Sequence, residues 1–280
     1  MKSARFAIAA IVTTALLSLG AFPTANREIY DKAQCRMSYA RSVRVLSTAL
    51  SLRVQACHRE RLRGNLPVGL DCNDPWSWQA AGYTEGHEGL EHDLYRYGLE
   101  SKTCTATVDT PDQVGYLSCP APCDAITVDS FAAFGSCLEC LNHPQSVDAW
   151  ETALGTPPVS GNGPANECQG AIGRAIVRYV TKRMKLQAGC EFKHEVSKDG
   201  YQNFECTDIG ASGHPLATRI NRFRARMIDS IARRCSFAEV GTLLDTCGSD
   251  GQSIGTCTVT AVEQWCAAMH GPTYPPLPPP

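Results

Sequence analysis

Two short strings in this sequence have residue types and spacings typical of metal or redox chemistry. The first, Cys137-Leu138-Glu139-Cys140, places two cysteines three positions apart, as in a redox-active dithiol or half of a zinc site. A dithiol oxidoreductase would need a βαβ context, which the surrounding sequence lacks, and His143 alone does not complete a zinc site. We therefore interpret Cys137 and Cys140 as structural disulfide cysteines, with metal binding or redox chemistry as the alternative.

The second string, His87-Glu88-Gly89-Leu90-Glu91-His92, combines two histidines with acidic residues. A zincin helix carries its histidines four positions apart so that both face one metal, whereas a step of five separates them by about 140°. We therefore interpret the string as a solvated acidic helix face, with a metal site as the alternative. The sequence thus predicts no metal site and no cofactor. It leaves catalytic residues unknown, because it contains no nucleophile-elbow, P-loop or dinucleotide motif.

Arginine and lysine are concentrated in two segments of the second half. Residues 169–189 contain five basic and no acidic residues, and residues 216–234 contain six arginines and one aspartate. If both segments are helices packed as a hairpin, their outer faces form one positive surface that attracts polyanions or anionic lipid headgroups. The alternative is a solvated face whose charges are balanced by acidic residues in nearby loops. The expected polyanion-binding residues are Arg178, Arg219, Arg222 and Arg226.

Residues 1–25 have the pattern of a signal peptide. Lys2 and Arg5 precede an apolar stretch over 6–19, which is shorter than the roughly 20 residues needed to span a membrane. Together with 15 cysteines, this leader predicts export to an oxidising compartment, as a secreted or periplasmic protein. No later segment reaches membrane length, so we expect the mature protein not to span a membrane.

The composition is that of a globular protein. Of 280 residues, 43% are hydrophobic and 19% are charged, which excludes wholesale disorder, and the net charge of −2 excludes a uniformly basic nucleic-acid binder. The charge is uneven, since residues 26–150 carry a net −5 and residues 151–280 a net +1. Neither value by itself identifies a partner.

The cysteine spacing repeats along the chain. Cys35 and Cys57 are 22 positions apart, and so are Cys168 and Cys190. Farther on, the string Phe134-Gly135-Ser136-Cys137 matches Ile254-Gly255-Thr256-Cys257 in the same order. These matches indicate two tandem copies of one module of ~115 residues.

A segment over 155–164, rich in Gly, Pro and Ser, separates the two copies. Cutting the chain at Gly161 is expected to release two fragments that each stay folded. The predicted organisation is a signal peptide at 1–25, a first Cys-rich helical module at 26–150, a Gly/Pro linker at 151–166, a second Cys-rich helical module at 167–271 and a Pro-rich tail at 272–280.

Apolar residues recur at three- and four-residue steps in each copy. The clearest stripes follow Cys35 and Cys168, and a third covers residues 216–231. The first copy has a weaker equivalent of that third stripe, over about 86–103, which glycines interrupt. The patterns predict a mainly α fold of two tandem disulfide-stapled helical-hairpin modules, with loops around the later cysteines.

Helix geometry limits how the first four cysteines of each copy can pair. A helix of 22 residues is about 33 Å long, so Cys35 cannot reach Cys57, because a disulfide needs Cα atoms within about 7 Å. An antiparallel hairpin places the second cysteine beside the third and the first beside the fourth. The predicted pairs are Cys35–Cys104, Cys57–Cys72, Cys168–Cys235 and Cys190–Cys206.

The later cysteines have no assigned partners from the sequence. Since 15 is an odd number, one thiol stays unpaired. We expect it to be Cys266, which has no match in the first copy and is a candidate for a free thiol or an intermolecular disulfide. The unassigned set is Cys119, Cys123, Cys137, Cys140, Cys247, Cys257 and Cys266.

The segments Cys168 to Cys190, Arg219 to Cys235 and Cys137 to Cys140 carry a resemblance to other proteins. In spacing, they resemble uncharacterised cysteine-rich exported bacterial proteins built of paired amphipathic helices. That family has no established activity, so the resemblance implies no catalytic residue. We expect an exported protein that acts by binding or as a structural component. The alternatives are an extracellular hydrolase with a site between the modules, and a metal-binding protein.

Overall fold

The computed structural model describes residues 24–67, 69–96, 102–155, 163–197, 201, 203–236 and 247–275. Within these ranges the protein is mainly helical and has no strand, which confirms the predicted fold class. The predicted signal peptide and the last five residues of the Pro-rich tail lie outside the described residues, except that the first helix begins at Thr24.

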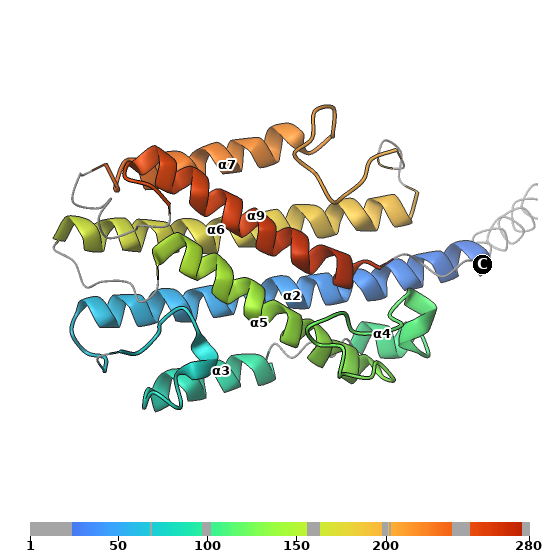
Figure 1. The fold of residues 1–280 in the computed structure, drawn as a ribbon. Helices are drawn as coiled ribbons and strands as arrows, with labels where there is room; N and C mark the ends of the chain where they lie inside the picture. Colours follow the sequence, from blue (N-terminus) through green and yellow to red (C-terminus); the bar gives the residue numbers. More distant parts are fainter. Residues whose placement is uncertain are drawn as a thin grey trace, which may run out of the picture.

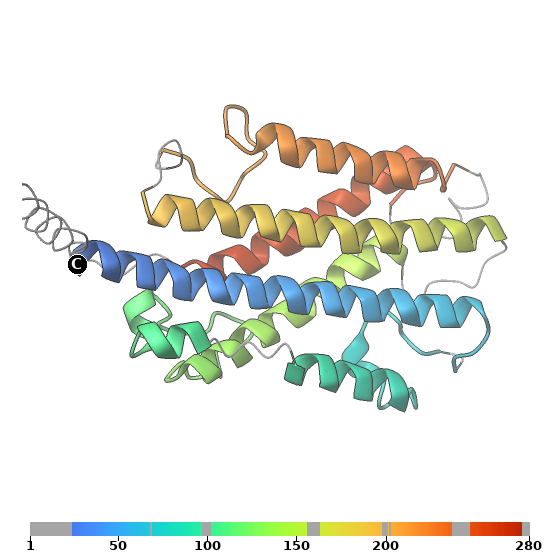
Figure 2. The same ribbon diagram turned by 180° about the vertical axis from the view of Figure 1, so that it is seen from behind.

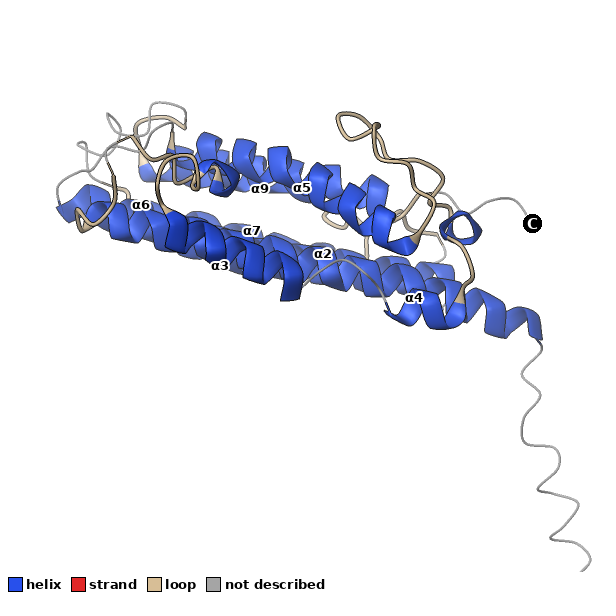
Figure 3. Ribbon diagram, turned by 90° about the horizontal axis from the view of Figure 1, so that it is seen from below, coloured by secondary structure: helices blue, strands red, loops and turns tan. Residues whose placement is uncertain are grey.

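Two long helices form the centre of the fold. Helix α2 (Thr24–Leu62) and helix α6 (Gly163–Glu195) lie side by side and run in opposite directions (Figures 1 and 2). Helices α5 (Phe131–Leu154) and α9 (Gly251–Thr273) pack against each other and cross over one face of this pair (Figures 1 and 3). The fold therefore places two central helices of each half in one two-layered bundle.

Shorter helices flank the central pair on its two sides. Helices α3 (Thr84–Arg96) and α4 (Lys102–Thr107) run back along α2, and α7 (Ala217–Ala232) runs along α6 (Figure 1). Two 3₁₀ turns, η1 (Pro75–Ser77) and η2 (Pro111–Val114), lie in the connections of the first half. Each half is thus a helical hairpin followed by one crossing helix.

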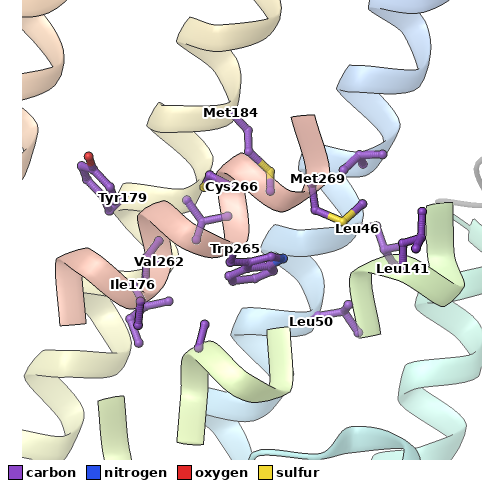
Figure 4. Close-up of a cluster of buried hydrophobic side chains, with 14 of the residues drawn as sticks. Leu46, Leu50, Leu141, Ile176, Tyr179, Met184, Val262, Trp265, Cys266 and Met269 are labelled. Carbon is purple, nitrogen blue, oxygen red and sulfur yellow. The ribbon is translucent and has the colours of Figure 1, made fainter. Parts of the chain in front are cut away.

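Sequence periodicity explains which helix faces are buried. On α2, residues Tyr39, Val43, Leu46, Leu50 and Val54 follow three- and four-residue steps and are all nearly inaccessible to solvent. They face a core that continues across both halves of the chain, where α5 and α9 add their own apolar side chains (Figure 4). Burial of one stripe per helix therefore holds the bundle together.

Approximate two-fold symmetry relates the two halves. The offset of 133 positions that equates Cys35 with Cys168 also equates Thr48 with Thr181. The hydroxyls of these two threonines lie 2.9 Å apart, where α2 and α6 meet. A residue contacting its own counterpart marks the symmetry axis, as in an isologous dimer. This contact is the one expected if the two predicted copies pack against each other as in an isologous dimer.

Helices α5 and α9 correct the prediction of loops around the later cysteines. Both begin at equivalent caps, because the Ser130 side chain accepts a hydrogen bond from the Ala133 amide, and Asp250 accepts from the amides of Gln252 and Ser253. A glycine allows the start of α9 to pack closely against α7. A Cβ atom on Gly251 would lie 2.6 Å from a backbone oxygen of α7, so only glycine allows this approach.

Three further details differ from the sequence expectations. The second helix of the first copy, expected over about 86–103, is divided into α3 and α4. The helix expected to start at His214-Pro215 begins at Ala217. Residues 151–154 and 163–166, at the ends of the predicted linker, are helical. Residues 156–162 of the predicted linker lie outside the described residues, and the module boundaries stay a prediction.

The hydrophobic core does not separate into two halves. A single buried cluster contains Leu46 and Leu138 of the first copy together with Ile176 and Trp265 of the second. The indole N–H of Trp265 donates to the Asn142 side-chain oxygen at 2.8 Å, across the boundary between the copies. We therefore no longer expect a fragment cut at Gly161 to stay folded alone, because separation would expose this surface.

Candidate functional site

The cysteine framework fixes the two hairpins. The structure joins Cys35 to Cys104 and Cys57 to Cys72 in the first half, and Cys168 to Cys235 and Cys190 to Cys206 in the second. These are the four pairs that helix geometry predicts. Their positions at the two ends of each hairpin hold α4 against α2 and α7 against α6.

The later cysteines also follow the duplication. Cys119 pairs with Cys137, and Cys247 pairs with Cys257 at the equivalent place. The first half adds a bridge between Cys123 and Cys140, which has no counterpart. These bridges confirm the interpretation of Cys137 and Cys140 as disulfide cysteines, and neither is a thiolate that could act in the alternative redox or zinc role.

Cys266 is the one cysteine outside the seven disulfides. It is 2% exposed, and burial raises the pKa of its thiol to about 12. A buried protonated thiol does not attack another chain. The expectation that Cys266 is the unpaired cysteine is confirmed, and its burial favours a free thiol over an intermolecular disulfide.

The other strings with chemical potential have structural explanations. His143 contacts the Asp74 carboxylate at 3.1 Å and stacks on the Trp76 ring at 3.9 Å, so it fixes a turn of the first half. His87 and Glu88 lie on α3, and the side chain of His92 lies outside the described residues. In the described part of the chain, no three His, Cys, Asp or Glu side chains gather in a way that could hold a metal ion.

A groove between α6 and α7 is the best candidate for a binding site. It encloses about 240 Å³ and is lined by a stripe from each helix with the same i, i+3, i+4, i+7 spacing. The stripes consist of Ala175, Arg178, Tyr179 and Lys182 on α6, and of Phe223, Arg226, Met227 and Ser230 on α7.

The groove combines an apolar floor with a cationic rim. Tyr179 and Met227 are buried, and Phe223 is partly buried. Arg178, Lys182 and Arg226 are exposed, and none has an ion-pair partner among the residues that the structure describes. No carboxylate or histidine lines the groove. Its chemistry is therefore that of an anion-binding site with an apolar base.

A buried charge network lies beneath the floor. The Glu263 carboxylate of α9 accepts hydrogen bonds from Nε–H of Arg183 at 3.0 Å and from Nε–H of Arg224 at 3.1 Å. The Tyr179 hydroxyl donates to the same carboxylate. Burial favours the neutral acid, but the two arginines keep the pKa of Glu263 below its ordinary value. Since Glu263 is occupied in this way, it does not neutralise the cations of the rim.

The structure brings together only part of the predicted polyanion-binding set. Arg178 and Arg226 line the groove from opposite helices. Arg219 and Arg222 are exposed on α7 but lie outside the groove lining. Both helices therefore contribute to the basic surface, and the groove occupies only part of that surface.

Lys182 is one of the five basic residues of the segment 169–189. Neither its place at the groove nor the apolar floor was predicted from the sequence. The i, i+3, i+4, i+7 stripe was present in both segments and could have been found. The sequence does not show that the two stripes face each other, because this depends on the angle between α6 and α7.

Comparison with protein-family models, with curated proteins and with solved structures finds no match for this chain. Within the described residues, no helix combines the length and the apolar character needed to cross a membrane. The function of this chain therefore has to be inferred from the chemistry of the site itself.

Proposed function

We propose that this chain is an exported binding protein whose α6–α7 groove binds a small anionic amphiphile, such as a medium-chain alkyl phosphate or carboxylate. One observation carries this proposal: three cations without ion-pair partners among the described residues surround an apolar cavity. The leader sequence and the seven disulfides support export.

The size and lining of the groove favour a short apolar group over a large ligand. Its volume of about 240 Å³ is below the 300–1,000 Å³ common for drug-sized ligands. Phe223 and Met227 offer an aromatic ring and a flexible thioether that adapt to an alkyl chain. The anionic headgroup would lie at the rim among Arg178, Lys182 and Arg226.

Charge complementarity favours an anion and not a neutral lipid. The rim carries three positive charges, and an arginine guanidinium can contact a phosphate or carboxylate through two parallel hydrogen bonds. Such contacts at an exposed rim are screened by salt. We therefore expect affinity to fall as ionic strength rises, while a contribution from the apolar floor remains.

Calorimetric titration of the mature, disulfide-intact protein with monomeric dodecyl phosphate tests this proposal. Binding of one molecule is expected, and dodecyltrimethylammonium, with the same chain and opposite charge, is expected not to bind. The double variant Arg178→Gln/Arg226→Gln should weaken binding by about 10- to 100-fold, or about 1.4–2.8 kcal/mol. Phe223→Ala should also weaken binding, because it removes part of the floor.

The matched control is Arg219→Gln/Arg222→Gln, which removes the same charge from the same surface outside the groove lining. It should keep most of the affinity for dodecyl phosphate. Equal loss in both double variants, or binding of the cationic detergent, would contradict a groove site.

A second candidate function, polyanion binding, is favoured by the continuation of exposed arginines along α7 through Arg222 and Arg219. It predicts retention on heparin at low salt, falling steeply with salt through counterion release. Heparin retention that depends equally on all four arginines, without binding of dodecyl phosphate, would support this function in place of the groove.

A further inference from the structure

A second, smaller cavity lies where the end of α9 meets α2 and α6. It encloses about 30 Å³, which is enough for one or two water molecules or a single ion. Four of the side chains that line it, Met184, Cys266, Met269 and His270, carry sulfur or imidazole nitrogen. The cavity is separate from the α6–α7 groove, and none of its lining residues is shared with that groove.

Helix spacing explains how the four donors meet. Cys266, Met269 and His270 occupy positions i, i+3 and i+4 of α9, so they share one face of the helix. Met184 extends from α6 toward the turn of α9 that carries Cys266, and Met269 lies on the next turn (Figure 4). All four residues are at most 8% exposed.

The ring of His270 is held by a carboxylate. Its Nε2 lies 2.6 Å from Oε1 of Glu191, and both side chains are largely buried. In the neutral ring, donation of Nε2–H to Glu191 leaves Nδ1 with its lone pair available. A carboxylate that fixes the tautomer in this way is the usual outer-shell partner of a metal-binding histidine.

The cavity wall also contains an orphan polar atom. The hydroxyl of Tyr274 is buried and has no hydrogen-bond partner among the residues that the structure describes, and the residue is 9% exposed. A buried hydroxyl without a hydrogen-bond partner is destabilising, because it has lost its hydration without replacement. The protein's own described groups therefore leave one polar atom of the cavity wall unsatisfied.

The equivalent place in the first half has no such donors. The offsets that relate the two copies equate Met184 with Ser51, Cys266 with Ser146, Met269 with Ala149 and His270 with Trp150. Trp150 is fully buried there. Two thioethers, a thiol and an imidazole thus replace two hydroxyls, a methyl and an indole at matched positions of the same helical frame.

We propose that this cavity is a binding site for one Cu(I) ion, held by the sulfurs of Cys266, Met184 and Met269 and by His270. Thiolate, thioether and imidazole ligands together are the set that Cu(I) prefers, whereas harder cations select carboxylate and carbonyl oxygens. On binding, the Cys266 thiol loses its proton to solvent and forms a Cu–S bond. No electron is transferred, and the seven disulfides are unchanged.

The proposal is tested with the full mature chain, oxidised, under anaerobic conditions. Cu(I) is supplied as its acetonitrile complex and competed with a chromogenic chelator such as bicinchoninate. We expect one Cu(I) per chain and a raised unfolding temperature of the loaded protein. Thiol titration in denaturant should find one thiol per chain before loading, which verifies that the disulfides are intact.

Variants distinguish the site from adventitious binding. Cys266→Ser and Cys266→Ala should both abolish stoichiometric binding, and Met184→Leu/Met269→Leu should weaken it at least about tenfold. Met37→Leu, at a buried methionine outside the cavity lining, should change nothing. The inference fails if Cu(I) stays with the chelator, if both Cys266 variants bind as the wild type does, or if binding requires reduction of the disulfides.

Discussion

The two halves of this protein have the same helical frame and different exposed and buried chemistry. Each has a hairpin closed by two disulfides and a crossing helix with a capped start. At the positions of Arg178 and Lys182, the first half has Val45 and Ala49. The helix that flanks α2 begins with acidic residues, whereas the one that flanks α6 is rich in arginine.

This difference shows which residues the fold needs and which it leaves free. Cysteines, cap residues and the apolar stripes recur because they determine the bundle. The groove and the small cavity occur at positions where the two copies differ, so stability of the frame does not account for their composition. These differences are the reason that the proposed binding sites lie in the second half.

The largest expected effect concerns the dependence of one half on the other. Proteolytic cleavage at an engineered site at Gly161 should leave both pieces associated, because one core contains residues of both. Size-exclusion chromatography without denaturant should show a single species of unchanged size. Two separate folded fragments would show that the halves are independent modules, as the linker alone predicts.

The long-range disulfides should contribute equally in the two halves. Cys35–Cys104 and Cys168–Cys235 close loops of 69 and 67 residues. Chain entropy assigns about 4 kcal/mol to each. Replacing either pair by alanine should lower the free energy of unfolding by that amount in denaturant titrations. A difference above about 2 kcal/mol between the two double variants would contradict an equivalent role of the two hairpins.

In the first half, His58 is expected to make stability depend on pH. His58 is buried, and desolvation lowers its pKa to about 4, although its Nε2 contacts the Asn73 oxygen at 2.9 Å. The folded state thus resists protonation that the unfolded chain accepts near pH 6.5. The contribution of His58 is present above pH 6.5 and is lost as the pH falls toward 4, by about 3 kcal/mol in total.

Urea unfolding of the wild type and of His58→Gln between pH 4 and 7 measures this contribution. Glu195, whose pKa burial raises to about 7, acts in the opposite direction over this range in both proteins. The difference between the two proteins therefore isolates His58. Parallel stability curves would mean that His58 is protonated as easily in the folded state as in the unfolded chain.

The smallest effect is expected at the symmetry axis. The hydroxyl oxygens of Thr48 and Thr181 lie 2.9 Å apart, and each is also within hydrogen-bond distance of a carbonyl of its own helix. One hydroxyl can therefore donate to the other while the second donates to its own carbonyl. Thr48→Val and Thr181→Val should each cost about 1 kcal/mol or less. The double variant should cost little more than either single one, because both remove the same contact. Additive losses would show that the contact between the threonines contributes nothing.

Much of the frame could be predicted from the sequence. The spacing of the first four cysteines in each copy, with helix length and disulfide reach, gave four pairs that the structure contains. This prediction succeeded because the geometry of an α-helix is fixed. Two cysteines 22 residues apart in a helix therefore have a defined distance and point to a defined side.

The crossing helices and the sites were harder to predict. Helix α5 contains Pro144 and clustered cysteines, which resemble loop signals, and its capping residue Ser130 was the overlooked sign of a helix start. The groove depends on how α6 and α7 pack, and the small cavity on how α9 crosses α2 and α6. Spacing along one segment carries no information about such angles.

The most direct test of the binding function is to locate a bound anionic amphiphile on the protein. A fatty acid that carries a diazirine on its alkyl chain is bound to the mature protein, activated by light, and mapped by peptide mass spectrometry after reduction. We predict labels within residues 175–182 of α6 and 223–230 of α7, suppressed by excess dodecyl phosphate. Labels that lie mainly on α2, α3 or α4, or that dodecyl phosphate does not suppress, would contradict the assignment of binding to the second half.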